Sequence, residues 1–331
     1  MRPFHYEHAA DRAEALKAAA AARNAQYLAG GTTLIDLMKL DVMRPATVVD
    51  INALAREHGE IRLKGDHLRL GALARMSDVA EHLAVRRDFP VIAQSLDLAA
   101  SPQIRNMASL GGNVLQRTRC AYFRDPSWAA CNKRDPGSGC AALTGVDRRL
   151  AVLGVSDHCI ANYPGDFAVA LAALGATVDL EGPAGRRVIP FEDLHRLPGD
   201  TPHIETTLKP GELITGFSIP AGPWTRRSLY LKVRDRQSYE FALASAAVAL
   251  DLDGEAVREV RIGVGGLAAK PWRSHEAEAA LQGKPLTEAT ARAAADAAFA
   301  QASAGGQRKF KPELGRRTLL RALLQARAME V

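Results

Sequence analysis

The chain has 331 residues, which is more than one ordinary hydrophobic core holds and predicts two or three domains. Hydrophobic residues make up 47% and charged residues 24%, which excludes general disorder, and no run approaches the roughly 20 apolar residues of a membrane helix. The net charge of +6 is spread along the chain and aromatic residues reach only 5%, so a nucleic-acid-binding surface is not expected.

The first segment has the pattern of a small parallel βαβ unit. An alanine-rich helix is expected over residues 9–23 and a short apolar strand over 26–29. Gly30-Gly31 and a threonine pair follow, and then an amphipathic helix over 34–39 and a strand over 47–51. A strand, a glycine turn and a helix in succession favour parallel pairing.

From about residue 56 the pattern changes to alternating segments, which are typical of antiparallel strands. Residues 61–73 show this alternation, whereas residues 116–145 show neither the helix nor the strand period. A segment of that length without its own periodicity is expected to be functional or disordered, and its cysteines favour function. We expect the remaining helices at 77–84, 88–99, 164–174, 274–282, 287–302 and 314–328, and the remaining strands at 176–182, 228–233, 246–254 and 257–264. A Pro/Gly/Trp stretch at 219–226 marks a domain boundary, and no internal repeat is seen.

Two glycine pairs stand where a chain can approach an anion. One lies in YLAGGTTLID (27–36) and the other in SLGGN (109–113). Glycine lets backbone N–H groups approach phosphate oxygens, and the N-terminus of a following helix adds partial positive charge. Each pair alone is also compatible with a plain turn between elements. Together they favour one anionic ligand held from two sides, such as a dinucleotide diphosphate.

A third glycine-rich run, residues 263–268, fits G-x-G-x-x-A after a strand-like segment. The dinucleotide fingerprint requires a helix to begin there. Pro271 interrupts any such helix at its start, so we interpret this run as a strand end followed by a turn.

All four cysteines, Cys120, Cys131, Cys140 and Cys159, fall within 40 positions. Short CxxC pairs typical of structural zinc are absent, and a disulfide framework is typical of small secreted proteins. Four thiolates in one Gly/Pro-rich loop suit an iron–sulfur cubane, while zinc and unrelated thiols remain alternatives. The basic residues beside them would offset the negative charge of a cluster: Arg117, Arg119, Arg124, Lys133 and Arg134. Nucleophile-elbow and zinc-protease motifs are missing.

Seven motifs, in order along nearly the whole chain, resemble the FAD-binding subunit of the molybdenum hydroxylases (the xanthine oxidase family). They are AGGTTLIDLMK, LGALARMSDV, IRNMASLGGNV, YPGDFAVALAALGA, PGELITGFSIP, YLKVRDRQSYEFALAS and GVGGLAAKPWRS. The insertion QRTRCAYFRDPSWAACNKRDPGSGC resembles the [4Fe–4S] loop in the FAD subunit of bacterial periplasmic aldehyde oxidoreductase, and a comparable loop occurs in 4-hydroxybenzoyl-CoA reductase.

The resemblance implies an α+β fold of the PCMH type (vanillyl-alcohol-oxidase-like). Two α/β subdomains, 1–55 and 56–222, would hold FAD between them, and the second would carry the [4Fe–4S] loop within 116–160. Residues 223–331 would form a CO-dehydrogenase-flavoprotein-like C-terminal domain with three antiparallel strands and a helical bundle.

The resemblance also implies site residues. The FAD contacts would be Tyr27, Leu28, Ala29, Gly30, Gly31, Thr32, Thr33, Leu34, Ser109, Leu110, Gly111, Gly112, Asn113, Asp166, Ile214 and Lys232. Asp166 would accept hydrogen bonds from ribose hydroxyls, with capping of the helix after Pro164 as the alternative. Cys120, Cys131, Cys140 and Cys159 would ligate the [4Fe–4S] cluster, and no residue of this chain would be catalytic toward the substrate.

The division of cofactors implies the partners. The chain has no candidate molybdopterin site and no plant-type ferredoxin motif, so a large molybdopterin subunit would carry the substrate chemistry and a small subunit two [2Fe–2S] clusters. We expect an electron-transfer subunit of a heterotrimeric aldehyde oxidoreductase that delivers electrons to an external acceptor. Alternatives are a subunit of a xanthine-type or aromatic acyl-CoA enzyme, a stand-alone flavoenzyme, or a non-catalytic scaffold. The charged N-terminus predicts no signal peptide, and hence a cytoplasmic subunit or a periplasmic one co-exported with a signal-bearing partner.

Overall fold

The N-terminal layer of the computed structural model, which describes residues 1–22 and 24–331, is a three-stranded parallel sheet in the order β1-β3-β2. Its elements are β1 (His5–His8), α1 (Arg12–Ala21), β2 (Ala25–Leu28), α2 (Leu34–Lys39) and β3 (Thr47–Asp50). Helix α1 begins later than predicted because the side chain of Asp11 caps it by accepting from Glu14 N. The predicted end of that helix, Arg23, lies outside the described residues. The parallel βαβ prediction is confirmed.

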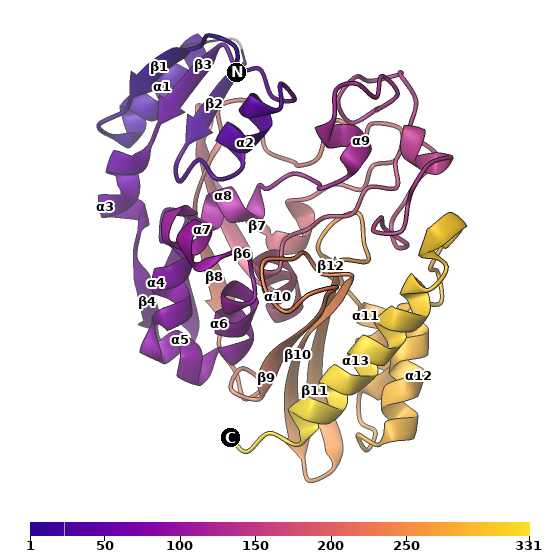
Figure 1. Ribbon diagram of the computed structural model, residues 1–331. Helices are drawn as coiled ribbons and strands as arrows, with labels where there is room; N and C mark the ends of the chain where they lie inside the picture. Colours follow the sequence, from indigo (N-terminus) through magenta and orange to yellow (C-terminus); the bar gives the residue numbers. More distant parts are fainter. Residues whose placement is uncertain (23) are drawn as a thin grey trace.

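The second layer is a five-stranded antiparallel sheet in the order β4-β5-β8-β6-β7, with small helices beside it (Figure 1). The predicted helix at 88–99 spans Pro90–Asp97, because proline is favoured in the first turn of a helix, and the predicted helix at 77–84 is interrupted at His82. The strands of this second sheet are β4 (Ile61–Lys64), β5 (His67–Gly71), β6 (Thr177–Gly182), β7 (Gly185–Pro190) and β8 (Leu213–Pro220). The helices are α3 (Ala55–His58), α4 (Met76–Glu81), α5 (Leu83–Asp88), α6 (Pro90–Asp97), α7 (Pro102–Met107), α8 (Leu110–Val114) and α10 (Phe167–Leu174).

The third layer is a four-stranded antiparallel sheet covered on one face by three helices. The three predicted strands are present, and a fourth of only two residues is added at the edge. Alternate residues of β10 face opposite cores, with Ala247 toward α10 and Val248 toward the C-terminal helices. The elements are β9 (Ser228–Val233), β10 (Ala244–Asp253), β11 (Ala256–Gly265), β12 (Trp272–Arg273), α11 (His275–Leu281), α12 (Glu288–Ala298) and α13 (Lys311–Arg327). The glycine-rich run at 263–268 ends β11 and turns at Gly266, as predicted.

Helix α10 joins the second and third sheets. All eight of its residues are buried, and it packs against β8 of the second sheet and against β10 and β11 of the third. The helix ends at Gly175, whose φ of 65° is left-handed and favours glycine.

The cysteine-bearing segment, residues 116–160, stands beside the N-terminal layer and above the third sheet (Figure 1). Its regular structure is limited to α9 (Ala121–Arg124) and a 3₁₀ turn at Ala141–Leu143. Its small core includes Tyr122, Phe123 and three of the four cysteines. Within residues 1–22 and 24–331, no helix is both long and apolar enough to cross a membrane.

Candidate functional site

A cavity of about 720 Å³ lies where the N-terminal layer, α8, β8 and the loop at 195–212 meet. Among the predicted contacts, it is bordered by Tyr27, Leu28, Ala29, Gly30, Gly31, Thr32, Thr33, Leu34, Ser109, Gly111, Gly112 and Ile214. The two glycine turns, far apart in sequence, therefore border one space. Its volume is in the range of known small-molecule and cofactor sites.

The first glycine turn joins β2 to α2. A Cβ atom at Gly30 would collide with the carbonyl oxygen of Met107, and Gly31 has a left-handed φ of 72°. Both positions therefore require glycine in the protein alone, in addition to any approach to a ligand. Thr33 stands at the N-cap of α2, but its hydroxyl makes no capping bond, which leaves that oxygen available at the cavity.

The second glycine turn begins α8. Gly111 N donates to Ala72 O at 2.8 Å, and a Cβ on Gly111 would lie 3.2 Å from the same oxygen. The hydroxyl of Ser109 accepts from Gly112 N at 3.3 Å, so it caps this short helix as well as bordering the cavity. Two predicted contacts of this motif do not border the cavity. Leu110 is fully buried in the core, and Asn113 Nδ2 donates to Met76 Sδ at 3.4 Å.

Tyr27 ties the first turn to the opposite wall. Its hydroxyl donates to Gly211 O at 2.9 Å, and burial raises its pKa to about 12. The phenol therefore stays neutral and keeps this hydrogen bond at ordinary pH.

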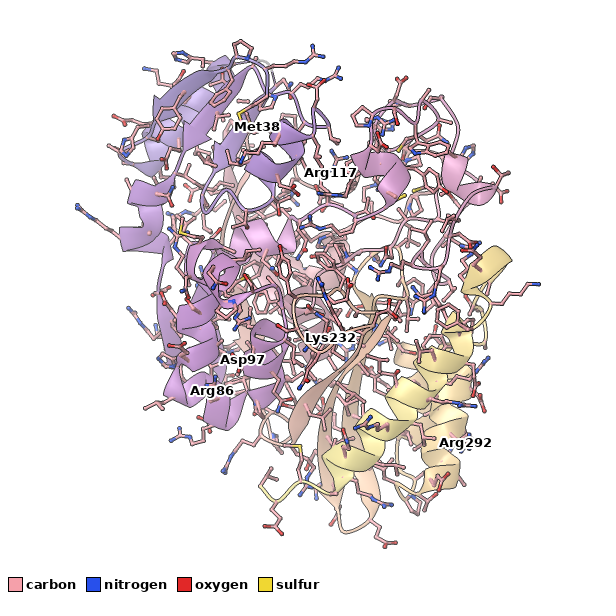
Figure 2. The ribbon with its side chains drawn as sticks, viewed as in Figure 1. Met38, Arg86, Asp97, Arg117, Lys232 and Arg292 are labelled. Atoms are coloured by element: carbon pink, nitrogen blue, oxygen red, sulfur yellow. The ribbon has the colours of Figure 1, made fainter. Side chains whose placement is uncertain are left out.

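Asp166 and Lys232 form a buried ion pair that does not border the cavity. Lys232 Nζ lies 2.7 Å from Asp166 Oδ2 and also donates to Leu98 O, while the Tyr230 hydroxyl donates to Asp166 Oδ1 at 2.7 Å. Burial raises the pKa of Asp166, and the Lys232 ammonium acts against this increase. The alternative prediction of a helix cap is wrong, because Asp166 occupies the N-cap of α10 without a side-chain capping bond. Figure 2 places Lys232 near the centre of the molecule.

Charged residues that are not among the predicted FAD contacts also line the cavity. Glu205 accepts from Arg117, and Lys133 Nζ lies 3.6 Å from the same carboxylate. Burial raises the pKa of Glu205, but the two cations outweigh it and hold the pKa below its ordinary value. Four cationic side chains and two carboxylates border the cavity: Arg117, Lys133, Arg196 and Lys209, and Glu205 and Glu212. This balance favours an anionic ligand.

The four cysteines border a second, smaller cavity. Cys120, Cys131 and Cys159 are buried, Cys140 is half-buried, and no disulfide joins them in the described part of the chain. Burial raises the pKa of Cys120 to about 11. As the thiols stand, the described residues include no three His, Cys, Asp or Glu side chains arranged to hold a metal ion. The four sulfur atoms that border this cavity are the type and number of donors that Cys₄ ligation of a cluster requires.

The basic residues of the cysteine segment have protein partners. Asp36 of α2 accepts from Arg119 at 3.0 Å and from Arg124 at 2.8 Å. Burial raises the pKa of Asp36, but the two guanidinium groups outweigh it and hold the pKa below its ordinary value. Arg134 donates to backbone carbonyls of the segment itself. The cysteine segment is thus joined by ion pairs to α2, directly after the first glycine turn.

The two cavities share a wall. Cys159, Lys133 and Ala161 border both of them. A change of shape at the cysteine site therefore reaches the larger cavity without an intermediate residue.

Comparisons with known proteins decide the family. Residues 2–222 match the FAD binding domain in molybdopterin dehydrogenase, and residues 229–326 match the CO dehydrogenase flavoprotein C-terminal domain. The chain belongs to the FAD-binding subunits of the molybdenum hydroxylases. It is thus a subunit of an oxidoreductase of the aldehyde oxidoreductase and CO dehydrogenase type, which confirms the predicted family and enzyme class.

Relatives of this FAD-binding subunit cover almost its whole length. The aldehyde oxidoreductase FAD-binding subunit PaoB of Escherichia coli K12 is 46% identical over 99% of both chains. The carbon monoxide dehydrogenase medium chain of Afipia carboxidovorans is 28% identical over 92% of this chain and 90% of its own length. A solved carbon monoxide dehydrogenase structure from Hydrogenophaga pseudoflava superposes with a TM-score of 0.77 at 26% identity, covering 99% of this chain and 98% of that one. The predicted α+β fold is confirmed.

Proposed function

We propose that this chain is the FAD and [4Fe–4S] electron-transfer subunit of a heterotrimeric molybdenum hydroxylase that oxidises aldehydes. It would take electrons from the [2Fe–2S] clusters of a small partner subunit and pass them to an external acceptor, while a large molybdopterin subunit binds the substrate. The observation that carries the proposal is the single cavity bordered by both glycine turns in a chain of an FAD-binding family. The aldehyde substrate is supported by the name of the relative at 46% identity.

The cavity residues have separate tasks in FAD binding. The backbone N–H groups around Gly30 and Gly31 would hold the diphosphate, and Gly111 and Gly112 would let the second turn approach it without a side chain between them. The excess of cationic side chains supports that charge. Ile214 would contact the adenine side. Leu110 and Asn113 would support the second turn from behind, because they do not border the cavity.

Asp166 and Lys232 have a positioning role in this proposal. Their ion pair connects the start of α10 to β9. The family resemblance instead predicts that Asp166 contacts a ribose hydroxyl and that Lys232 lies on the flavin side. The Asp166→Ala variant separates this direct contact from the positioning role. Bound FAD supplies the exchange between single-electron and two-electron chemistry.

For the cysteine site we propose one [4Fe–4S] cluster. The four thiols that border one cavity support the ligand set. The segment also has little regular structure, and a segment of this length without regular structure is expected to have a function. The raised pKa of Cys120 means that ligation would release a proton from this buried thiol. The alternatives, zinc and free thiols, are separated from the cluster by metal analysis.

The test uses the full chain purified without oxygen, alone and co-expressed with its partner subunits. We expect stoichiometric FAD, about four irons per chain by the Cys₄ rule, and turnover of aldehydes in the assembled complex. Absence of FAD would overturn the flavin assignment, and zinc in place of iron would overturn the cluster. Turnover of xanthine or an aromatic acyl-CoA without turnover of aldehydes would overturn the substrate class.

A further inference from the structure

We infer that Arg117 is a nucleotide-binding residue whose Nη1 atom donates a hydrogen bond to an acceptor oxygen of bound FAD, on the diphosphate or on a flavin carbonyl. The sequence suggested a different task for this residue, that of offsetting the charge of a cluster at the cysteines. The inference rests on the proposed FAD site, because Arg117 borders the same cavity as the two glycine turns.

The position of Arg117 assigns it to the nucleotide cavity. It follows the last residue of α8 by three positions and borders the larger cavity, but it does not border the cavity of the cysteines. Phe123 has the opposite placement, since it borders the cysteine cavity and not the larger one. The Arg117 guanidinium lies over the Phe123 ring at 4.4 Å, a cation–π contact. The charge of Arg117 is therefore on the nucleotide side of this ring.

Glu205 holds one edge of the same guanidinium. Nε of Arg117 donates to Glu205 Oε1 at 2.8 Å, and Nη2 donates to the same oxygen at 2.5 Å. Both side chains are mostly buried, with 23% and 24% of their surface exposed. With the Phe123 ring under one face and a carboxylate along one edge, the planar group is oriented before a ligand binds.

The remaining nitrogen of Arg117, Nη1, carries two N–H donors. It has no hydrogen-bond partner among the described residues. Unlike Nε of Arg119, it is also not enclosed by protein atoms. A ligand in the cavity that Arg117 borders can therefore reach these donors.

The chemistry of a guanidinium limits what Nη1 can contact. It donates hydrogen bonds and accepts none, so the ligand atom must be an acceptor. Arg117 and Lys133 are two cations that share the carboxylate of Glu205, which leaves one net positive charge beside the cavity. Such a charge favours oxygens that carry negative or partial negative charge, which FAD offers at its diphosphate and at the flavin carbonyls.

The experiment compares variants of the full chain after removal of FAD. Arg117→Met should bind FAD at least about tenfold more weakly, the size of a lost hydrogen bond from a charged donor. The matched control is Arg187→Met. Arg187 pairs with Glu212 through two nitrogens, and Glu212 borders the cavity whereas Arg187 does not. This control also leaves a cavity carboxylate without its arginine, and we expect less than about a threefold change because charge effects through water are screened.

A double variant separates a lost donor from repulsion by the carboxylate left behind. Arg117→Met combined with Glu205→Gln removes both charges, and FAD binding should stay about tenfold weaker because the donor is still missing. Recovery of wild-type affinity in the double variant would overturn the inference.

Two fragments of FAD locate the acceptor. ADP carries the diphosphate without the flavin, and riboflavin carries the flavin without phosphate. If Nη1 donates to the diphosphate, Arg117→Met should weaken ADP binding and leave riboflavin binding unchanged. The reverse result would place the contact at a flavin carbonyl. Wild-type affinity for both fragments in Arg117→Met would overturn a direct contact.

Chemical modification tests the same contact in the wild-type chain, without depending on the fold of a variant. Phenylglyoxal reacts with accessible guanidinium groups, and peptide mass spectrometry gives the rate at each arginine. FAD should slow the modification of Arg117 and leave that of Arg187 unchanged. Equal rates at Arg117 with and without FAD, or equal FAD affinities of Arg117→Met and Arg187→Met, would overturn the inference. Failure of the wild-type chain to bind FAD would overturn the proposed function itself, so the two failures are distinguishable.

Discussion

The third sheet with its helices and the cysteine segment are neighbours that hold their shape by different means. The first has a continuous apolar core in which Val248, Ile262 and Leu323 are fully buried. The segment at 116–160 has a small core that includes three of its cysteines, and ion pairs connect the segment to α2 and to Glu205. Stability from apolar burial does not depend on charge screening or on a metal, whereas stability from partly exposed charge pairs depends on screening and stability from thiol ligands depends on a metal. The order of the cysteine segment is thus expected to follow its ligand.

The largest effect is expected when one cysteine is replaced. Cys131→Ala should reduce the iron content from about four to near zero, because the ligands act as a set. It should also expose residues 116–160 to limited proteolysis and loosen FAD through the shared wall. The matched change in the other region is Leu281→Ala, which empties a fully buried position and should cost about 2–5 kcal/mol of unfolding free energy while iron content stays constant. If both variants lose iron equally, the two regions do not differ in the way described.

The next test acts at the first glycine turn. Gly30→Val should abolish FAD retention, because the side chain would meet Met107 O and block the approach of the backbone to phosphate. Gly111→Val should weaken FAD in the same way. Gly305→Val is the control, since that glycine has φ of −124° and nothing within 4 Å of its Cβ position. Far-UV circular dichroism should remain near wild type in all three, and full FAD content in Gly30→Val would reject the role of the turn.

Asp166→Ala tests the ion pair between the start of α10 and β9. It leaves the Lys232 ammonium buried without its partner, so we expect a loss of about 3–5 kcal/mol in the free energy of unfolding by urea. Adding Lys232→Met should recover much of this stability. A variant of unchanged stability with FAD affinity reduced by about 1–3 kcal/mol would instead support the direct ribose contact.

Lys311 joins the two contrasted regions and makes their contact dependent on pH. This buried ammonium donates to Leu150 O at 2.8 Å and to Gly266 O at 2.6 Å, and burial, followed by nearby arginines, lowers its pKa from 10.5 to about 7. Between these two values the unfolded chain binds more protons, so the free energy of unfolding should rise with pH, by about 2 kcal/mol from pH 7 to pH 9. Below pH 7 both states are protonated and this rise is absent. Denaturation of Lys311→Met across that range should lack it, and an identical slope in both proteins would contradict the assignment.

The smallest effect is expected at Asp36, whose side chain is 35% exposed. Asp36→Ala should cost about 1 kcal/mol at low salt and less at high salt, since exposed ion pairs are weak and screened. It should also speed proteolysis of the cysteine segment. Arg292→Ala, which breaks an exposed pair with Glu288 on α12 (Figure 2), should leave that proteolysis unchanged. Equal effects of the two variants would show that the pairs at Asp36 do not hold the segment.

Sequence patterns predicted the elements wherever the reason was local. Helix α2 has the predicted bounds, and the strands of the third sheet lie within one or two residues of their expected places. The second glycine turn was found for the same reason, because glycines in a short motif have a local signature.

The contacts that no sequence pattern predicted are those between residues far apart in the chain. His195 and Glu205 border the cavity from an irregular loop. Their hydrogen-bond partners, Val114 and Arg117, lie about 80 to 90 positions away in the sequence. Asp166 was found, but its partners Tyr230 and Lys232 come from β9, which the sequence could not place beside it. A motif identifies a residue type at a spacing, whereas the hydrogen-bond partner of a buried side chain is decided by tertiary packing.

The wall shared by the two cavities restricts how this protein can be redesigned. Cys159 and Ala161 serve as lining on both sides, so the cysteine segment cannot be cut out as a detachable insertion. A shortened chain that omits it has to supply a new surface of similar shape at these positions, or the nucleotide cavity opens to water. Removing Cys159 therefore calls for an apolar replacement of similar volume, whereas the exposed side chain of Trp128 imposes no such requirement on the larger cavity.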